Sequence, residues 1–313
     1  MTNLSEFTFL SSDGKTQLHG MLWEPEGVAV RAVLQICHGV AEHIARYDGF
    51  ARALNEQGIV VAGHDHLGHG KSLPEGGTPV YFGEGNTWNT VVDDIYVLHQ
   101  RLKQRYPDVP LCIMGHSMGS FLTRTYLIRY PGTVKAAVIM GTGWQPQAAI
   151  TGGLALANAI AAVSGESATS ELVTELAFGS YNKLFAPNRT KVDWLSADES
   201  NVDDYIADPL CGADATVGLF RQMLHGIRFN QRQSHLRQMD REMPVLFVAG
   251  DKDPVGNCGK GVRQTYDAFR AAGMRDCTLK LYPGLRHEIL NEKAYTADIT
   301  KNIEAWLLSR LEK

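Results

Sequence analysis

The stretch Leu111–Ser120, LCIMGHSMGS, decides the fold. Residues 111–116 form an apolar run that predicts a buried strand, and the pattern after Ser117 predicts a helix. Glycines two residues before and after the serine give room for a sharp turn that holds its hydroxyl out at the edge of a sheet. The pattern therefore predicts a nucleophile elbow. The alternative is an ordinary loop between a strand and a helix.

Eight short apolar runs predict strands, and amphipathic segments between most of the later runs predict helices. The runs are residues 5–9, 18–23, 32–38, 59–65, 111–116, 136–141, 245–251 and 278–284. Helices are expected over Arg46–Gln57, Val91–Tyr106 and Ser117–Tyr130, each followed by Gly or Pro. This alternation predicts an α/β fold with a mostly parallel eight-stranded sheet covered on both faces. The first two runs predict an antiparallel entry hairpin.

The alternation stops between Trp144 and Arg241, where helical patterns occur without a convincing core strand. We therefore expect residues 1–143 and 242–313 to form the core, and residues 144–241 to form an inserted helical cap. The longest apolar stretch, Ala148–Val163, lies in this cap and is shorter than a membrane span. It is expected to be a buried helical hairpin, with a pocket wall or a membrane-touching lid as alternatives.

The overall charge excludes a general nucleic-acid-binding surface. The 313-residue chain is 44% hydrophobic and has a formal net charge of −4. Within the cap, residues 193–214 hold seven acids and no Lys or Arg, and residues 221–241 hold five arginines and two histidines. Both runs are expected to be solvated helix faces. The alternative for the basic run is contact with an anionic head group or membrane surface.

The cysteine pattern and the N-terminus predict a cytoplasmic protein, with a peripheral membrane location as the alternative. The five cysteines are widely spread, and no C-x-x-C pair indicates zinc. No basic segment followed by an apolar core precedes the first predicted strand, so no secretory signal is predicted. Cys258 is expected to be an inert thiol, or else to confer sensitivity to thiol reagents. The sequence indicates no oligomeric state.

A serine nucleophile needs a base and a carboxylate, and each of the last two predicted strands is followed by one of them. Asp253 follows VLFVAGD, and His287 follows TLKLYPG. The chain order Ser117, Asp253, His287 is that of the α/β-hydrolase triad. Asp251 competes for the role of the acid, although loop amides are its expected partners.

Two backbone amides, those of Val40 and Met118, are predicted to form the oxyanion hole. Met118 follows the serine, and Val40 lies in the loop HGVAEH at 38–43, after the third predicted strand. Gly39 allows that loop to pass close to the site, and a plain turn is the alternative. His38 and Glu42 are expected to brace the loop rather than to touch substrate.

The segment GHDHLGHG at 63–70 suggests a metal site, because His64, His66 and His69 have the spacing of a metallo-hydrolase H-x-H-x-D-H motif. Gly68 occupies the position where that motif requires Asp, and no later ligand set stands out. We therefore predict neither a metal nor a cofactor. Asp65 and the three histidines are expected to fasten the loop instead.

Five motifs, HGVAEH, GHDHLGHGKS, GHSMGS, GDKDP and RHEILNE, resemble the monoglyceride lipase and lysophospholipase family of α/β-hydrolases in order and spacing. The cap resembles that family only in short segments such as SYNKLF and DPLCG. The resemblance implies hydrolysis of a small-molecule lipid ester with one acyl chain, by the triad Ser117, Asp253 and His287 with the Val40 and Met118 amides. The cap residues expected to line an acyl tunnel, or else simply the cap core, are Leu154, Leu156, Ile160, Phe178 and Phe185.

Two other functions stay open. An amidase, iminopeptidase or perhydrolase-like enzyme would use the same triad, since the fold does not choose the bond. A peptidase would need carboxylates to hold a substrate amine, whereas the cap is apolar. The second alternative is a non-catalytic binding protein, but such proteins usually lack a triad member and none is missing here.

Overall fold

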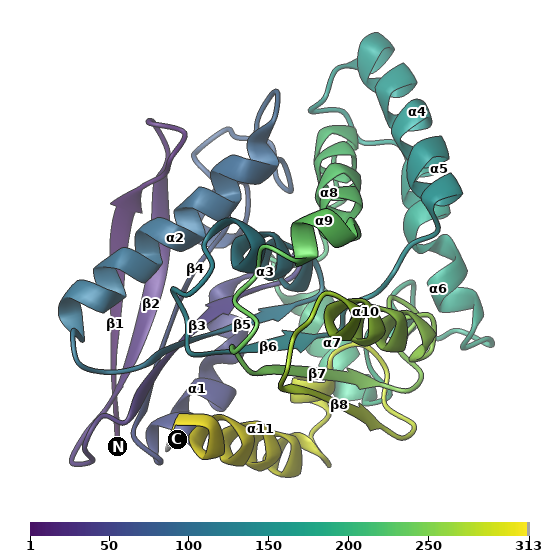
Figure 1. Ribbon diagram of the computed structural model, residues 1–313. Helices are drawn as coiled ribbons and strands as arrows, with labels where there is room; N and C mark the ends of the chain where they lie inside the picture. The colour runs from purple at the N-terminus through teal and green to yellow at the C-terminus, as the bar shows by residue number, and fades with distance from the viewer. Residues whose placement is uncertain (312–313) are drawn as a thin grey trace.

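The computed structural model describes residues 1–311 and is built on one eight-stranded sheet (Figure 1). The strands are β1 (Thr2–Leu10), β2 (Gln17–Pro25), β3 (Ala32–Cys37), β4 (Ile59–His64), β5 (Leu111–His116), β6 (Ala136–Met140), β7 (Val245–Gly250) and β8 (Cys277–Tyr282). Their order is β1-β2-β4-β3-β5-β6-β7-β8. β2 pairs antiparallel with β1 and β4, and the other pairs are parallel. The eight predicted strands and the entry hairpin are confirmed.

Helices cover both faces of the sheet because successive strand residues point to opposite sides. Val33 belongs to a core cluster with α2 and α3, whereas Leu34 belongs to a second cluster with α1 and α11. The core helices are α1 (Asp48–Asn55), α2 (Thr87–Arg105), α3 (Met118–Arg129), α10 (Lys260–Ala271) and α11 (Thr296–Leu311). Short 3₁₀ turns are η1 (Ile44–Tyr47), η2 (Gly70–Ser72) and η5 (Ile289–Asn291). Figure 1 shows α1 and α11 below the sheet and α2 and α3 above it.

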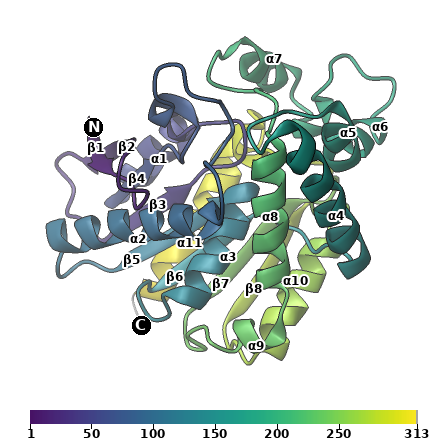
Figure 2. The same cartoon turned by 90° about the horizontal axis from the view of Figure 1, so that it is seen from above.

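Between β6 and β7 the regular elements are helices joined by turns and loops, with an isolated bridge between Thr169 and Thr216. The elements are α4 (Gln147–Ser164), α5 (Glu171–Thr174), η3 (Glu175–Gly179), α6 (Ser180–Lys183), η4 (Asp193–Leu195), α7 (Glu199–Ala207), α8 (Val217–Asn230) and α9 (Gln233–Leu236). Helix α8 contacts α2, α3 and α4. Gly226 lets α8 approach α2, since a Cβ at this position would collide with the ring of Trp88. Figure 2 shows α4, α5 and α6 grouped beside α8.

The expected buried hairpin at Ala148–Val163 is wrong. Residues 147–164 form one continuous helix, α4, in which only Ile150, Leu154 and Ala157 are buried. By length and composition alone α4 could cross a membrane, with a mean hydropathy of 1.3, and 17% of this window is buried in the structure. Gly153 faces Leu224 of α8, so small residues continue the helix and allow close packing instead of forming a turn.

Asp94 on α2 is a buried carboxylate that holds the β1–β2 turn. Its side chain accepts hydrogen bonds from Ser11 Oγ at 2.8 Å and from the Ser12 amide at 2.5 Å. Burial raises the pKa of Asp94 to about 6, even though these hydrogen bonds act in the opposite direction. The folded state therefore disfavours ionisation, and stability is lost as the pH rises from the unfolded-state pKa to about 6.

We expect Asp94→Asn to stabilise the protein at pH 8 by about 2 kcal/mol relative to wild type, and much less at pH 4. Urea unfolding of both proteins at the two pH values measures this difference. The exposed Asp108→Asn provides the control. A variant that is less stable than wild type at pH 8 would show that the hydrogen bonds of the carboxylate outweigh its burial.

Candidate active site

Ser117 lies in a strained turn between β5 and α3. Its φ of 54° and ψ of −122° are unusual for a residue other than glycine. A Cβ on Gly119 would collide with the Cys37 carbonyl, and one on Gly115 would collide with Thr123 Oγ1. The sharp turn that the sequence predicts is therefore present, and both glycines are required by its close packing.

Asp253 and His287 are paired at the ends of β7 and β8. His287 Nδ1 lies 3.0 Å from Asp253 Oδ1, and the two side chains are 2% and 0% exposed. Asp251 instead accepts the Gly284 amide at 2.8 Å. The exposed Cys258 donates its amide to the Asp253 carbonyl at 2.8 Å, so it lies on the same loop as the acid. The structure thus brings Asp253, not Asp251, to the histidine.

The His287 ring reaches the turn at Ser117 by packing on His116. The centroids of the two rings are 4.7 Å apart, and a Cβ on Gly141 would lie 3.1 Å from each of them. Among residues 1–311 no hydrogen bond joins the Ser117 hydroxyl to His287. A serine hydroxyl reorients by rotation about χ1, and contacts of this kind tighten only with bound substrate.

The amides of Val40 and Met118 have no acceptor within the described part of the chain. Met118 is the first residue of α3, so its amide lacks an intrahelical partner. The loop of Val40 passes beside the serine, since a Cβ on Gly39 would lie 3.1 Å from the Ser117 Cβ. Both amides are therefore available to an oxyanion near Ser117.

The Glu42 side chain connects the loop of Val40 to the turn at Ser117 through hydrogen-bonding contacts. Its Oε1 accepts the Gly39 amide at 2.5 Å and the Tyr47 hydroxyl at 3.1 Å, and it lies 3.1 Å from His116 Nδ1. Burial acts to raise the pKa of Glu42, but His116 outweighs it and holds this pKa well below the usual range. Burial likewise acts to lower the pKa of His116, but Glu42 raises it. An ion pair therefore stands next to the serine.

His38 also braces this loop, as the sequence analysis expects. Its Nδ1 lies 2.7 Å from the Gly39 carbonyl, and its Nε2 accepts the His66 amide at 3.0 Å. His116 was missed as a partner of Glu42. The only sequence signal was its place inside the serine motif.

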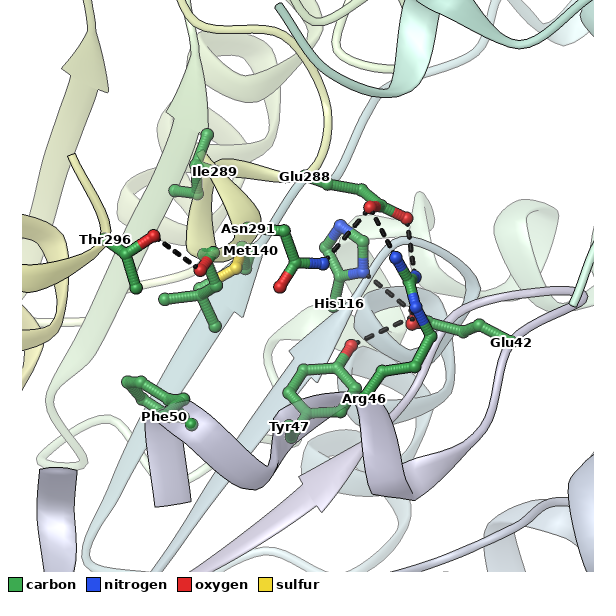
Figure 3. A pocket seen from close by; sticks show the side chains of 12 residues that line it. Glu42, Arg46, Tyr47, Phe50, His116, Met140, Glu288, Ile289, Asn291 and Thr296 are labelled. Atoms are coloured by element: carbon green, nitrogen blue, oxygen red, sulfur yellow. Dashed lines mark hydrogen bonds and ion pairs between the residues drawn. The ribbon is translucent and has the colours of Figure 1, made fainter. Parts of the chain in front are cut away.

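A second buried ion pair joins Arg46 to Glu288, the residue that follows His287 in the chain (Figure 3). Arg46 donates to the two carboxylate oxygens of Glu288 at 2.7 and 2.8 Å, and Asn201 of α7 donates to Glu288 at 2.8 Å. Arg46 also lies 3.0 Å from Glu42, so one guanidinium connects the Val40 loop, the His287 loop and α7. Neither Arg46 nor Glu288 is predicted from the sequence to belong to the site.

A cavity of about 190 Å³ adjoins these charges. Its lining includes Glu42, Arg46, Tyr47, His116, Glu288 and Asn291, which point toward one another in Figure 3. The cavity is thus polar on the side next to His116.

We expect Glu42→Gln to lower kcat by about 10- to 100-fold. The neutral amide lacks the negative charge that holds His116, and it accepts a weaker hydrogen bond from the Gly39 amide. Steady-state hydrolysis of a soluble aryl ester measures this loss. The control is Asp48→Asn, which removes an exposed partner of Arg52 on α1. Activity within about twofold of wild type for Glu42→Gln would contradict a role for this ion pair.

Aromatic side chains of the segment between β6 and β7 cover His287. The Trp194 ring is 5.1 Å from the His287 ring, measured between centroids. The Phe178 ring stacks on the Trp194 ring with centroids 6.1 Å apart, and the Tyr181 ring meets the Trp194 ring edge-on with centroids 5.2 Å apart. Phe220 continues this aromatic roof at 5.3 Å from Phe178. The side of His287 that faces the cap segment is therefore apolar.

The residues expected to line an acyl tunnel occupy different places. Phe178 belongs to the aromatic roof, whereas the Phe185 ring lies 4.0 Å from the Arg286 guanidinium. Leu154 is buried, and Leu156 and Ile160 pack around the same cluster. Their contact with an acyl chain stays a prediction.

The histidines of the 63–70 segment pack ring to ring. His66 lies 5.1 Å from His64 and 6.5 Å from His69, and burial lowers the pKa of His64 to about 3. Asp65 accepts the amides of Ile44 at 2.8 Å and Lys71 at 2.9 Å. Asp65 thus fastens the loop, as expected.

The known proteins to which this chain is similar in sequence and fold include lipases and an esterase. A family model described as serine aminopeptidase, S33 (Hydrolase_4), matches residues 28–294. A monoacylglycerol lipase of Mycolicibacterium smegmatis is 30% identical, covering 98% of both chains. A monoglyceride lipase of Mus musculus is 28% identical over 96% of this chain and 90% of its own length. The crystal structure of a thermostable carboxyl esterase from Bacillus coagulans, in complex with glycerol, superposes with a TM-score of 0.92 at 26% identity, covering 99% of this chain and 100% of that one.

Proposed function

The chain belongs to the Hydrolase_4 (serine aminopeptidase, S33) family of α/β-hydrolases and is a carboxylic ester hydrolase, and we propose that it cleaves single-acyl-chain lipids of the monoacylglycerol type. Its relatives from Mycolicibacterium smegmatis and Mus musculus, named for this activity, match nearly the whole chain. The proposal assigns Ser117, Asp253 and His287 as the triad.

The chemistry proceeds through an acyl-enzyme. Ser117 Oγ attacks the ester carbonyl while His287 Nε2 takes the hydroxyl proton, and the Val40 and Met118 amides hold the resulting oxyanion. Asp253, bonded to Nδ1 at 3.0 Å, fixes the tautomer that leaves Nε2 free to accept. His287 then protonates the leaving alcohol. Water attacks the acyl-enzyme with His287 as the base, and the fatty acid is released.

The aromatic roof over His287 is the observation that carries the choice of substrate. An alkyl chain gains about 0.8 kcal/mol for each methylene that such a surface buries. An aminopeptidase needs a carboxylate for the substrate ammonium, but Glu42 and Glu288 are engaged by His116 and Arg46. This arrangement supports a lipid ester over a peptide amide, although the family name includes peptidases.

Comparison of kcat/KM across substrates tests this proposal. The panel contains monoacylglycerols of several chain lengths, a lysophospholipid, an aryl ester with the same acyl group, and an aminoacyl amide. We expect monoacylglycerols to be the best of the lipid substrates, with kcat/KM rising as the chain lengthens. Lysophospholipid hydrolysis is a second activity that the apolar roof allows. A preference for the amide would overturn the proposal.

We further propose that this enzyme is cytoplasmic and that it meets membranes transiently through α4 and the segment from α5 to the residue after α6, residues 171–184. Leu172, Leu176 and Leu184 are 54%, 65% and 60% exposed, and Val163 at the end of α4 is 89% exposed. These elements lie beside one another (Figures 1 and 2). Exposed apolar side chains of this size gain free energy by insertion among acyl chains.

Replacement of Leu176 and Leu184 by serine is expected to reduce vesicle binding by about 30-fold or more, because each leucine contributes roughly 1–2 kcal/mol when buried in lipid. Co-sedimentation with phosphatidylcholine vesicles measures the bound fraction. Leu10→Ser, which changes a 48% exposed leucine on β1, is the matched control. Equal binding by the double variant and wild type would exclude this surface.

A further inference from the structure

Three potential metal ligands meet where the turn after α7 rests on the loop of Val40. His43 Nε2, a carboxylate oxygen of Asp208 and Cys211 Sγ all lie within 4.8 Å of one another. His43 Nε2 is 2.8 Å from Asp208 Oδ2. The two segments are also joined independently of this trio, because Tyr205 Oη and the Gly212 amide each donate to the Ala41 carbonyl at 3.0 Å. The trio is therefore held together before any ion binds.

The donor set suits zinc. Imidazole, carboxylate and thiolate are the ligands that Zn²⁺ accepts, whereas Mg²⁺ and Ca²⁺ favour oxygen donors alone. Ligand atoms of a tetrahedral zinc site lie roughly 3.2–3.8 Å apart. The distances to Cys211 Sγ, at most 4.8 Å, would therefore shorten by up to about 1.6 Å, and the 2.8 Å distance between His43 Nε2 and Asp208 Oδ2 would lengthen by about 0.5 Å. Asp208 Oδ1 accepts the Leu210 amide at 2.9 Å, which orients Oδ2 toward His43.

The charges around the trio leave one carboxylate to balance a cation. The charged groups that act on the Cys211 thiol are the Arg46 guanidinium, with the largest effect, and the carboxylates of Glu42, Asp208 and Glu288. Glu288 is paired with Arg46 and Glu42 with His116, so Asp208 is the carboxylate that remains for a metal. The Asp208 side chain is 28% exposed and that of His43 is 10% exposed. An ion can therefore reach the trio from solvent and still be bound mainly within protein.

We propose that His43, Asp208 and Cys211 bind one Zn²⁺ ion, with a fourth position left to water. The Cys211 thiol releases its proton to solvent as the Zn–S bond forms. Neutral His43 exchanges its Nε2 proton through solvent for one on Nδ1, so that the hydrogen bond to Asp208 is replaced by one bond from Nε2 and one from the carboxylate to the metal. The ion ties the turn after α7 to the loop that carries Val40, so it stabilises the folded protein against heat. The site lies outside the proposed triad, and this inference does not depend on the substrate.

Titration of chelator-treated protein with Co²⁺ tests the site, because a thiolate ligand gives a sulfur-to-cobalt charge-transfer band. We expect one Co²⁺ per chain, displacement of the band by Zn²⁺, and a higher unfolding temperature with Zn²⁺. Cys211→Ser should lose the band and the stabilisation. Cys258→Ser, which changes an exposed cysteine outside the trio, should keep both.

Asp208→Asn gives a second measurement that leaves the thiol in place. It should weaken Co²⁺ binding by more than the roughly 10- to 100-fold loss typical of an outer-sphere partner. Wild-type protein without a charge-transfer band, or a band that survives in Cys211→Ser, would overturn the proposal. In that case the trio is a His–Asp hydrogen bond beside an unrelated thiol.

Discussion

Ser117→Ala is expected to lower monoacylglycerol hydrolysis by about 10⁴-fold or more, with no comparable change in the unfolding temperature. The variant keeps the backbone turn and both candidate oxyanion amides, but it removes the oxygen that forms the acyl bond. Residual activity then comes only from binding and oxyanion stabilisation. Fatty-acid release under saturating substrate measures the loss.

Ser120→Ala is the matched control for this experiment. Ser120 is a buried serine one turn further along α3, and its hydroxyl donates to the Ser117 carbonyl at 2.6 Å. Its loss should change the rate by less than about tenfold, because only a backbone contact is removed. Full activity of Ser117→Ala would exclude the acyl-enzyme mechanism. Equal losses in the two variants would point to damage of the turn rather than to loss of a nucleophile.

Asp253→Asn is expected to have the second largest effect, a loss of about 10⁴-fold in kcat. Asp253 Oδ1 lies 3.0 Å from His287 Nδ1 and accepts the Val255 amide at 2.9 Å. The Val255 amide constrains the asparagine to keep its oxygen in this place, so the imidazole still receives a hydrogen-bond acceptor but loses the negative charge that stabilises its protonated form. An inverted amide would instead favour the wrong tautomer. Both outcomes slow the reaction.

Asp251→Asn separates this effect from damage to the loop. Asp251 precedes Asp253 by two residues, and its side chain accepts the loop amide of Gly284 at 2.8 Å and no other hydrogen bond from residues 1–311. We expect its kcat to stay within about tenfold of wild type. A larger loss in Asp251→Asn than in Asp253→Asn, measured with the same aryl ester, would reverse the assignment of the acid.

The sheet core could be predicted because each pattern that indicates it lies within one short segment of the sequence. Strand residues such as Val33 and Leu34 lie in a run that is apolar except for Gln35, as expected for a parallel strand covered on both faces. The turn at Ser117 depends on two glycines within two residues of it. The positions of Asp253 and His287 directly after β7 and β8 place them together, because the carboxyl ends of neighbouring parallel strands meet at one edge.

The network around Arg46 and Glu288 could not be predicted, because its members are remote in sequence. Arg46 and Glu288 are 242 residues apart, and Asn201 comes from a third segment. Nothing in the pattern around Arg46 distinguishes it from an exposed helix residue. Pairing of this kind depends on how the cap segment docks on the core, which periodicity does not report.

The wrong expectation for α4 has a related cause. Its composition, rich in alanine and glycine, is that of a buried helix, but only one narrow stripe meets α8. An apolar composition indicates that a helix surface is unfavourable in water, but it does not indicate which element packs against that surface. In the aromatic roof, Phe178 was expected as a possible tunnel residue, whereas its contacts with Trp194 and Phe220 could not be predicted because the three side chains come from separate elements.

The most direct test of the account is the position of a covalent acyl mimic on the protein. Wild-type enzyme treated with a fluorophosphonate, with and without competing monoacylglycerol, is analysed by intact mass and then by peptide mapping. We expect one adduct per chain, located on Ser117 and suppressed by the monoacylglycerol. An adduct on another residue, or ester hydrolysis that continues without any adduct, would contradict the account.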